Sequence, residues 1–195
     1  MGTRGAIGFR LGKKDYIIYN HFDSYPAGLG RDMVYEFKSL SDEDFSQLKD
    51  RIAKITLIDG SQPPTPEQIE ATRPYHNLSV SEQSTSDWYC LLREAQGTLT
   101  PYMMGQLTLM LDYKKFLANS LFCEYAYIFN LSKNVLEFYE GFNKNPDAPG
   151  RYASLSEDGK YYGVALVAEF PFAKLRDLPE EDIVNEMIRM VEDDN

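Results

Sequence analysis

The stretch FCEYAYIFNLSKNVLEFYEGF, residues 122–142, decides the fold class of this chain. It holds two runs of residues that favour strands, 122–131 and 134–142, separated by Ser132 and Lys133. Two such runs around a short polar turn predict a β-hairpin. Both faces of the first run are largely apolar, which is typical of a strand that is covered on both sides. We therefore expect residues 122–131 to form a central strand of a sheet.

A second hairpin is expected near the N-terminus. Residues 5–11 and 15–20 are separated by a turn that begins at Gly12, and the run Tyr16-Ile17-Ile18-Tyr19 is rich in residues that favour strands. A further strand is expected over residues 160–170.

Apolar residues recur at helical spacing between and after these strands, and capping residues mark several helix starts. We expect six helices. The first begins near Arg31, the second begins at Ser41, and the third covers residues 67–72. The fourth begins at Ser86 and ends at Gly97, the fifth covers residues 101–121, and the sixth begins at Pro179. The segment 101–121 suits a strand as well as a helix. The order of hairpin, helices, hairpin, strand and helix contains no linker. It predicts one α+β domain over residues 1–195, with an antiparallel sheet layered with helices.

The composition restricts the classes of partner. The 195 residues carry a net charge of −10, and such a surface repels nucleic acids and anionic membranes. We therefore expect no direct binding of nucleic acid and no membrane association. The charge either favours a basic protein partner or only serves solubility, and it leaves room for a local basic pocket. The sequence shows no secretory leader and no apolar run of about 20 residues, which indicates a cytoplasmic protein.

Metal and cofactor sites are not expected. The two cysteines, Cys90 and Cys123, lie in apolar runs and are interpreted as buried free thiols. Together with His21 and His76 they form no close pair at ligand spacing. The sequence contains no P-loop, nucleophile elbow or Cys-x-x-Cys motif.

The loop that follows the N-terminal hairpin is the main candidate site. Its polar side chains, which we expect to bind a ligand, are Asn20, His21, Asp23, Ser24 and Tyr25. Histidine titrates near neutrality, and Asp23 could orient His21. Loops held by a rigid scaffold often carry function. The alternative is ordinary turn chemistry, in which Asp23 and Ser24 bond to nearby backbone.

The stretch Gly28-Leu29-Gly30-Arg31 precedes an expected helix. Free N–H groups at a helix start attract anions, and Arg31 could add a bidentate grip on phosphate or carboxylate. We therefore add Gly28, Gly30 and Arg31 to the expected ligand-binding residues, with a simple turn as the alternative. Arg4 is added as well, and Arg10 belongs to the same region of the sequence. Solvated charge at a strand end is the alternative for both arginines.

Several segments carry a resemblance to a known group. Residues 1–5 (MGTRG), 19–26 (YNHFDSYP) and 28–30 (GLG) resemble a group of small hypothetical proteins from phages and bacteria, and residues 119–127 and 136–141 are similar to it as well. The resemblance implies a phage origin, with the host cytoplasm as location. It also implies a role against host defences, by binding a host protein or a nucleotide signal.

A second resemblance concerns the first residues. Gly2-Thr3 followed by a hairpin is similar to the start of N-terminal-nucleophile hydrolases, in which a freed first residue attacks an amide. The resemblance implies a related layered α+β fold with Thr3 as nucleophile.

Three hypotheses about function follow. The first is a non-enzymatic binding protein whose partner is a host protein or a small anionic ligand. The second is an amide or nucleotide hydrolase that uses Thr3 or Ser24 as nucleophile, or His21 with Asp23 as acid and base. The third is a structural or assembly subunit, which would form a stable homo-oligomer.

Overall fold

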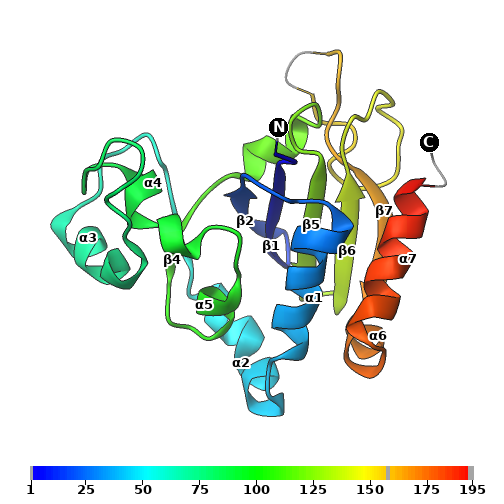
Figure 1. The fold of residues 1–195 in the computed structure, drawn as a ribbon, viewed down its shortest axis with the longest axis horizontal. Helices are drawn as coiled ribbons and strands as arrows, with labels where there is room; N and C mark the ends of the chain where they lie inside the picture. Colours follow the sequence, from blue (N-terminus) through cyan, green and yellow to red (C-terminus); the bar gives the residue numbers. More distant parts are fainter. Residues whose placement is uncertain (1, 157–158, 193–195) are drawn as a thin grey trace.

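A computed structural model describes residues 2–156 and 159–192 of the chain. A five-stranded sheet forms its centre (Figure 1). The strands, in spatial order, are β2 (Lys14–Asn20), β1 (Gly5–Leu11), β5 (Tyr125–Asn130), β6 (Val135–Glu140) and β7 (Ala165–Pro171). Neighbouring strands are antiparallel except β1 and β5, which are parallel. The expected α+β class and both expected hairpins are confirmed.

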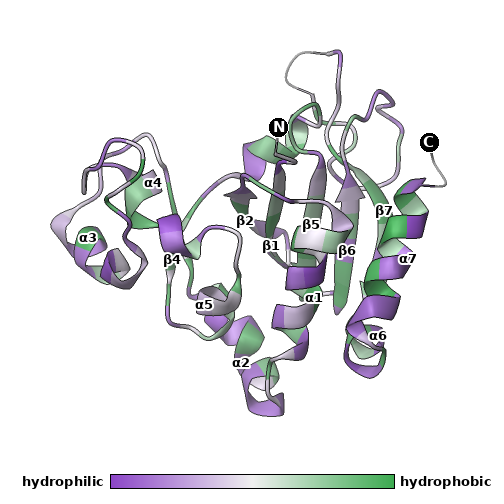
Figure 2. Ribbon diagram, viewed as in Figure 1, coloured by the Kyte–Doolittle hydropathy of each residue, from purple (hydrophilic) through white to green (hydrophobic). Residues whose placement is uncertain are grey.

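Helices cover one face of the sheet. They are α1 (Arg31–Lys38), α2 (Asp42–Ala53), α6 (Phe172–Asp177) and α7 (Glu180–Glu192). In Figure 1, α1 lies in front of the sheet and α7 lies beside β7. The rings of Phe37 on α1 and Phe129 on β5 stack with centroids 5.1 Å apart. Burial of each such ring contributes roughly 1.5–3 kcal/mol. Hydrophobic and hydrophilic residues alternate around α7 in Figure 2, and its buried residues include Ile183 and Met187, as expected.

The other face of the sheet is covered by irregular segments rather than by helices. The 3-10 turn η4 (Lys114–Ala118) and residues from the segment between β6 and β7 pack there on small and branched side chains. The buried residues of this second core are Ala6, Ile17, Leu117, Cys123, Ala126, Ile128, Tyr139, Tyr152 and Val164. Strand β5 is therefore buried on both faces, as its apolar pattern predicted.

A smaller lobe projects from the β2 edge of the sheet (Figure 1). Its elements are β3 (Thr56–Ile58), α3 (Pro66–Thr72), η2 (Arg73–Tyr75), α4 (Trp88–Leu91), η3 (Arg93–Ala95), α5 (Thr100–Met103) and β4 (Leu109–Leu111). Strands β3 and β4 form a separate parallel pair. The lobe joins β2 through the backbone of Tyr113, whose N–H donates to the carbonyl of Ile17 at 3.0 Å.

Three expected elements differ in the structure. The continuous helix favoured over 101–121 does not form: helix α5 stops before Gly105, which has φ +69, and residues 109–111 form a strand with β3, in line with the strand alternative for this segment. Helix α4 is capped by Asp87 rather than by Ser86, because the Asp87 carboxylate accepts from the backbone N–H of Tyr89. Strand β7 begins at Ala165 rather than at residue 160, because the backbone before it bonds to other loops: Val164 N donates to Leu117 O at 2.9 Å.

The two cysteines are buried and free, as expected. Within the described ranges, no helix combines the length and the apolar character that crossing a bilayer requires.

Candidate ligand-binding site

The loop after β2 is a tightly bonded turn. The amide side chain of Asn20 donates to Ser24 Oγ at 2.9 Å and also to the carbonyl of Phe22. The Ser24 backbone N–H donates to Thr3 O at 3.1 Å, and the Tyr127 hydroxyl donates to Ser24 O at 3.0 Å. Ser24 is fully buried. Asn20 and Ser24 therefore fix the turn and present no polar group to a ligand from outside.

The glycines of the expected anion site serve close packing. Residues Pro26–Gly30 form a π-helical turn, η1, that runs directly into α1. A Cβ atom on Gly28 would lie 2.2 Å from the Asp23 carbonyl oxygen, and one on Gly30 would lie 3.0 Å from the Tyr127 ring. The N–H groups of Gly28 and Gly30 both bond to the carbonyl of Tyr25. These donors are therefore already used within the turn.

The three N-terminal arginines do not converge. Arg31 Nη1 lies 3.6 Å from Glu180 Oε1, which ties the start of α1 to the start of α7. Arg10 Nη1 lies 2.7 Å from Asp15 Oδ1, at the turn end of the first hairpin. Only Arg4 lies beside His21.

Arg4 and His21 share a hollow at the end of the sheet where β1 and β5 begin and β2 ends. We call it the Arg4 hollow. It has a volume of about 520 Å³, which is within the usual range of roughly 300–1,000 Å³ for ligand pockets. The residues that line it are Gly2, Thr3, Arg4, His21, Leu121, Phe122, Glu124 and Phe142.

The guanidinium group of Arg4 is exposed and stacks on an exposed ring. Its carbon lies 5.2 Å from the centre of the Phe122 ring, which is itself 44% exposed. The Arg4 backbone N–H donates to Glu124 Oε1 at 3.1 Å, but among the described residues no carboxylate forms an ion pair with the guanidinium. An aromatic face orients a guanidinium and leaves its N–H groups free for a carboxylate or phosphate.

His21 is held by the residue two positions before it. Its Nδ1 atom lies 2.6 Å from the Tyr19 hydroxyl, and its ring meets the Phe22 ring edge-on at 4.3 Å. Burial raises the pKa of Tyr19, and the positive charge of Arg4 opposes this rise.

Two predicted residues of the loop lie apart from this hollow. Asp23 is exposed, adopts φ +52, and within the described part of the chain makes no hydrogen bond to His21. Tyr25 is exposed and contacts Gly28 rather than the lining of the hollow.

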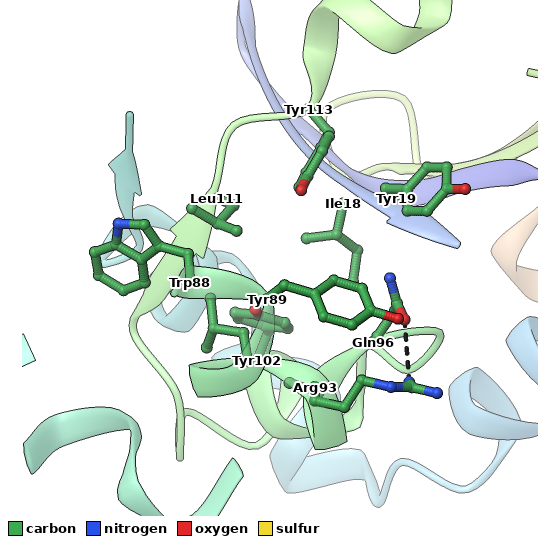
Figure 3. Close-up of a pocket in the computed structure, with 11 residues that line it drawn as sticks. Ile18, Tyr19, Trp88, Tyr89, Arg93, Gln96, Tyr102, Leu111 and Tyr113 are labelled. Carbon is green, nitrogen blue, oxygen red and sulfur yellow. Dashed lines mark hydrogen bonds between the residues drawn. The ribbon is translucent and has the colours of Figure 1, made fainter. Parts of the chain in front are cut away.

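An aromatic slot lies at the seam between β2 and the lobe (Figure 3). Tyr19, Tyr89 and Tyr113 line it together with Arg93, whose Nη1 donates to Gln96 Oε1 at 3.0 Å. Its volume of about 40 Å³ admits a few water molecules but is far smaller than a ligand pocket. We interpret the residues that line the slot as packing that holds the Tyr19 ring in place.

Phe142 stands between the Arg4 hollow and a second hollow of about 630 Å³. Its φ of +52 belongs to the left-handed region, where a bulky residue costs about 1–3 kcal/mol, and its side chain is 52% exposed. We call the second recess the Lys144 hollow. The residues that line it are Glu140, Gly141, Phe142, Asn143, Lys144, Asn145, Pro149, Ala165, Leu166 and Val167.

Sequence reasoning found Thr3, Arg4 and His21 but missed Phe122, Phe142 and Lys144. The sequence contained one usable signal: Phe142 is the last residue of the expected hairpin and lies, with Lys144, in the polar stretch 141–145. A large aromatic residue in such a stretch is unusual, because loops favour small polar residues.

In the part of the chain that the structure describes, no group of three or more His, Cys, Asp or Glu side chains could hold a metal ion. Protein-family models, curated proteins and solved structures were all compared with this chain, and none of them matches it. The site is therefore interpreted from its geometry.

Proposed function

We propose that this chain is a non-enzymatic binding protein, and that the Arg4 hollow receives an anionic group of its ligand. The ligand is a host protein or a small anionic molecule such as a nucleotide. One observation carries the proposal: the exposed guanidinium of Arg4 stacks on Phe122 at the hollow and has no acidic partner among the described residues.

The contrast with other arginines supports this interpretation. The chain holds 30 acidic and 20 basic residues, so an acidic partner is available to most cations. Six of the other eight arginines form ion pairs, which are Arg10–Asp15, Arg31–Glu180, Arg51–Asp44, Arg73–Glu70, Arg151–Glu137 and Arg176–Asp42. Arg93, which bonds to Gln96, and Arg189 form none among the described residues. Arginine and aromatic residues are enriched where proteins bind partners, and Arg4 and Phe122 supply both at one place.

The placement of the catalytic candidates favours binding over catalysis. The Ser24 hydroxyl is buried and bonded to Asn20, and the Nδ1 atom of His21 is bonded to Tyr19. A nucleophilic hydroxyl requires a base within hydrogen-bond reach, which neither arrangement supplies.

One observation favours the hydrolase alternative. Thr3 and His21 line the same hollow, which puts a hydroxyl and a titratable ring on its wall. Assays with amide and nucleotide substrates test this alternative, and loss of turnover in both Thr3→Ala and His21→Ala would establish it.

Anion binding is tested by NMR. Inorganic phosphate, acetate and AMP are added separately to the ¹⁵N-labelled protein, and the signals of Arg4 and its neighbours are followed. We expect at least one anion to shift these signals, and Arg4→Gln to abolish the shift. Arg189→Gln is the matched control, because Arg189 is exposed, lies on α7 and forms no ion pair within the described residues. The proposal fails if no anion shifts the Arg4 signals.

A further inference from the structure

The two hollows meet at one residue. Phe142 lines both the Arg4 hollow and the Lys144 hollow, and more than half of its side chain is exposed between them. A small anion occupies only one such recess. A ligand that contacts both hollows must lie across Phe142.

The backbone at Phe142 is held in its strained conformation from both sides. Phe142 N–H donates to Ser120 O at 2.7 Å, and Gly141 N–H donates to Glu124 O at 2.8 Å. The surrounding structure therefore forces an aromatic side chain into solvent at a position with φ +52, where glycine would fit without strain. An exposed ring gains little from burial within its own chain. Strain of this kind is typical of ligand-contacting residues.

The charges beside Phe142 indicate the chemistry of the occupant. Arg4 lines one hollow together with Glu124, whose Oε1 atom accepts from the Arg4 backbone N–H, and Lys144 lines the other together with Glu140. Among the described residues, neither carboxylate forms an ion pair with the cation of its hollow. Lys144 is exposed, its Nζ lies 5.5 Å from the centre of the Tyr161 ring, and no carboxylate in the described ranges forms an ion pair with it. Leu166 and Val167 add apolar surface to the Lys144 hollow.

We propose that the ligand is an acidic segment of a partner protein that lies across both hollows. An apolar side chain of the segment packs on Phe142, one acidic side chain pairs with Arg4, and a second pairs with Lys144. This inference rests on the proposed function, since it requires the Arg4 hollow to accept an anionic group. It goes further by making Phe142 the anchor and Lys144 the second cation.

The test selects short peptides from a random library on the wild-type protein, with counter-selection on the Phe142→Gly variant. A fluorescently labelled peptide of the enriched sequence is then titrated and its anisotropy measured. We expect the enriched peptides to carry acidic residues on both sides of an apolar residue. We expect Phe142→Gly to weaken binding about tenfold or more, and Arg4→Gln and Lys144→Gln about three- to tenfold each.

Matched controls separate binding from folding. Tyr35→Ala removes another exposed aromatic ring, which is 63% exposed on α1, and Lys13→Gln removes an exposed cation in the β1–β2 turn. Neither control should change the affinity for the peptide. Phe142→Gly should unfold at the temperature of the wild type or above it, because glycine relieves the strain.

Enrichment of basic peptides, the absence of any consensus, or binding that survives Phe142→Gly would overturn the inference. If small anions still shift the Arg4 signals in that case, the proposed function stands without it. If neither anions nor peptides bind, both proposals fail.

Discussion

The hydroxyl oxygen of Tyr19 and the Nδ1 atom of His21 lie 2.6 Å apart. Burial raises the pKa of Tyr19, so its phenol is protonated at neutral pH and can donate this hydrogen bond. We expect Nδ1 to accept from this phenol, which requires the tautomer of His21 that carries its proton on Nε2. The ring then offers a donor, which suits an anionic ligand better than a reaction that needs a base.

In the Tyr19→Phe variant, the His21 ring should no longer be held in the tautomer with the proton on Nε2. Without the hydroxyl, Nδ1 loses its partner and both neutral tautomers become populated. The ring ¹⁵N chemical shifts of His21 measure the change. Tyr113→Phe is the control, since the Tyr113 ring packs 5.8 Å from the Tyr19 ring without bonding to His21. Unchanged ring shifts in Tyr19→Phe would show that the hydroxyl does not set the tautomer.

Ser24→Ala should reduce stability without affecting ligand binding. The substitution leaves the buried Asn20 side chain without its bond to the Ser24 hydroxyl, at a cost of about 1–3 kcal/mol. Urea denaturation measures the loss, and the NMR titration with anions should match that of the wild type. A variant with wild-type stability but no anion binding would assign Ser24 to the site instead.

Arg151→Met should be strongly destabilising. Arg151 Nη1 lies 2.5 Å from Glu137 Oε2, and Nη2 lies 3.6 Å from Asp15 Oδ1, and both carboxylates are buried. Removal of the guanidinium leaves the buried Glu137 carboxylate without its cation, whereas Asp15 keeps Arg10, and the loss costs about 3–5 kcal/mol. The loss is measured by urea denaturation.

The double variant Arg151→Met/Glu137→Gln is the control for that prediction. It should be more stable than Arg151→Met alone, because the unpaired charge of Glu137 is removed as well. A double variant that is less stable than either single variant would contradict the role of charge at this position.

Stability should fall at alkaline pH. Burial raises the pKa of Tyr102 and Tyr127 above the ordinary tyrosine value of about 10. In the unfolded chain these phenols ionise near that value while the folded protein keeps them neutral. Their contribution is therefore complete below about pH 10 and is lost as the pH rises above it.

Denaturation midpoints recorded between neutral and alkaline pH measure this loss. Tyr102→Phe removes one of the groups and should make the decline less steep. An equal slope in wild type and variant would exclude Tyr102 as a contributor.

The sequence predicted those elements whose formation depends on residues close together in the chain. Runs of residues that favour strands identified both hairpins, and Ser41 and Pro179 marked two helix starts. The segment 101–121 was misassigned because the strand at 109–111 exists only through its pairing with β3, some fifty residues earlier. A run of three residues carries no periodicity from which such a pairing could be recognised.

The candidate site was predicted only in part for a similar reason. Arg4 and His21 were found because they belong to one region of the sequence, and the first hairpin brings them together in the structure. Phe122 and Phe142 join them only through the parallel pairing of β1 with β5, which is not encoded in any short stretch. Arg31 was expected in the site, but it pairs with Glu180 at the start of α7. The sequence predicted this helix but not that it packs beside the helix of Arg31.

The parallel contact between β1 and β5 also has a consequence for synthesis of the chain in the cell. Arg4 bonds to Glu124 across 120 positions, so the first hairpin leaves the ribosome long before its central neighbour is made. Until then, one edge of β1 has unsatisfied backbone groups and its apolar side chains lack a cover. Closing so long a loop is slow, and we expect the nascent hairpin to be prone to aggregation during that interval.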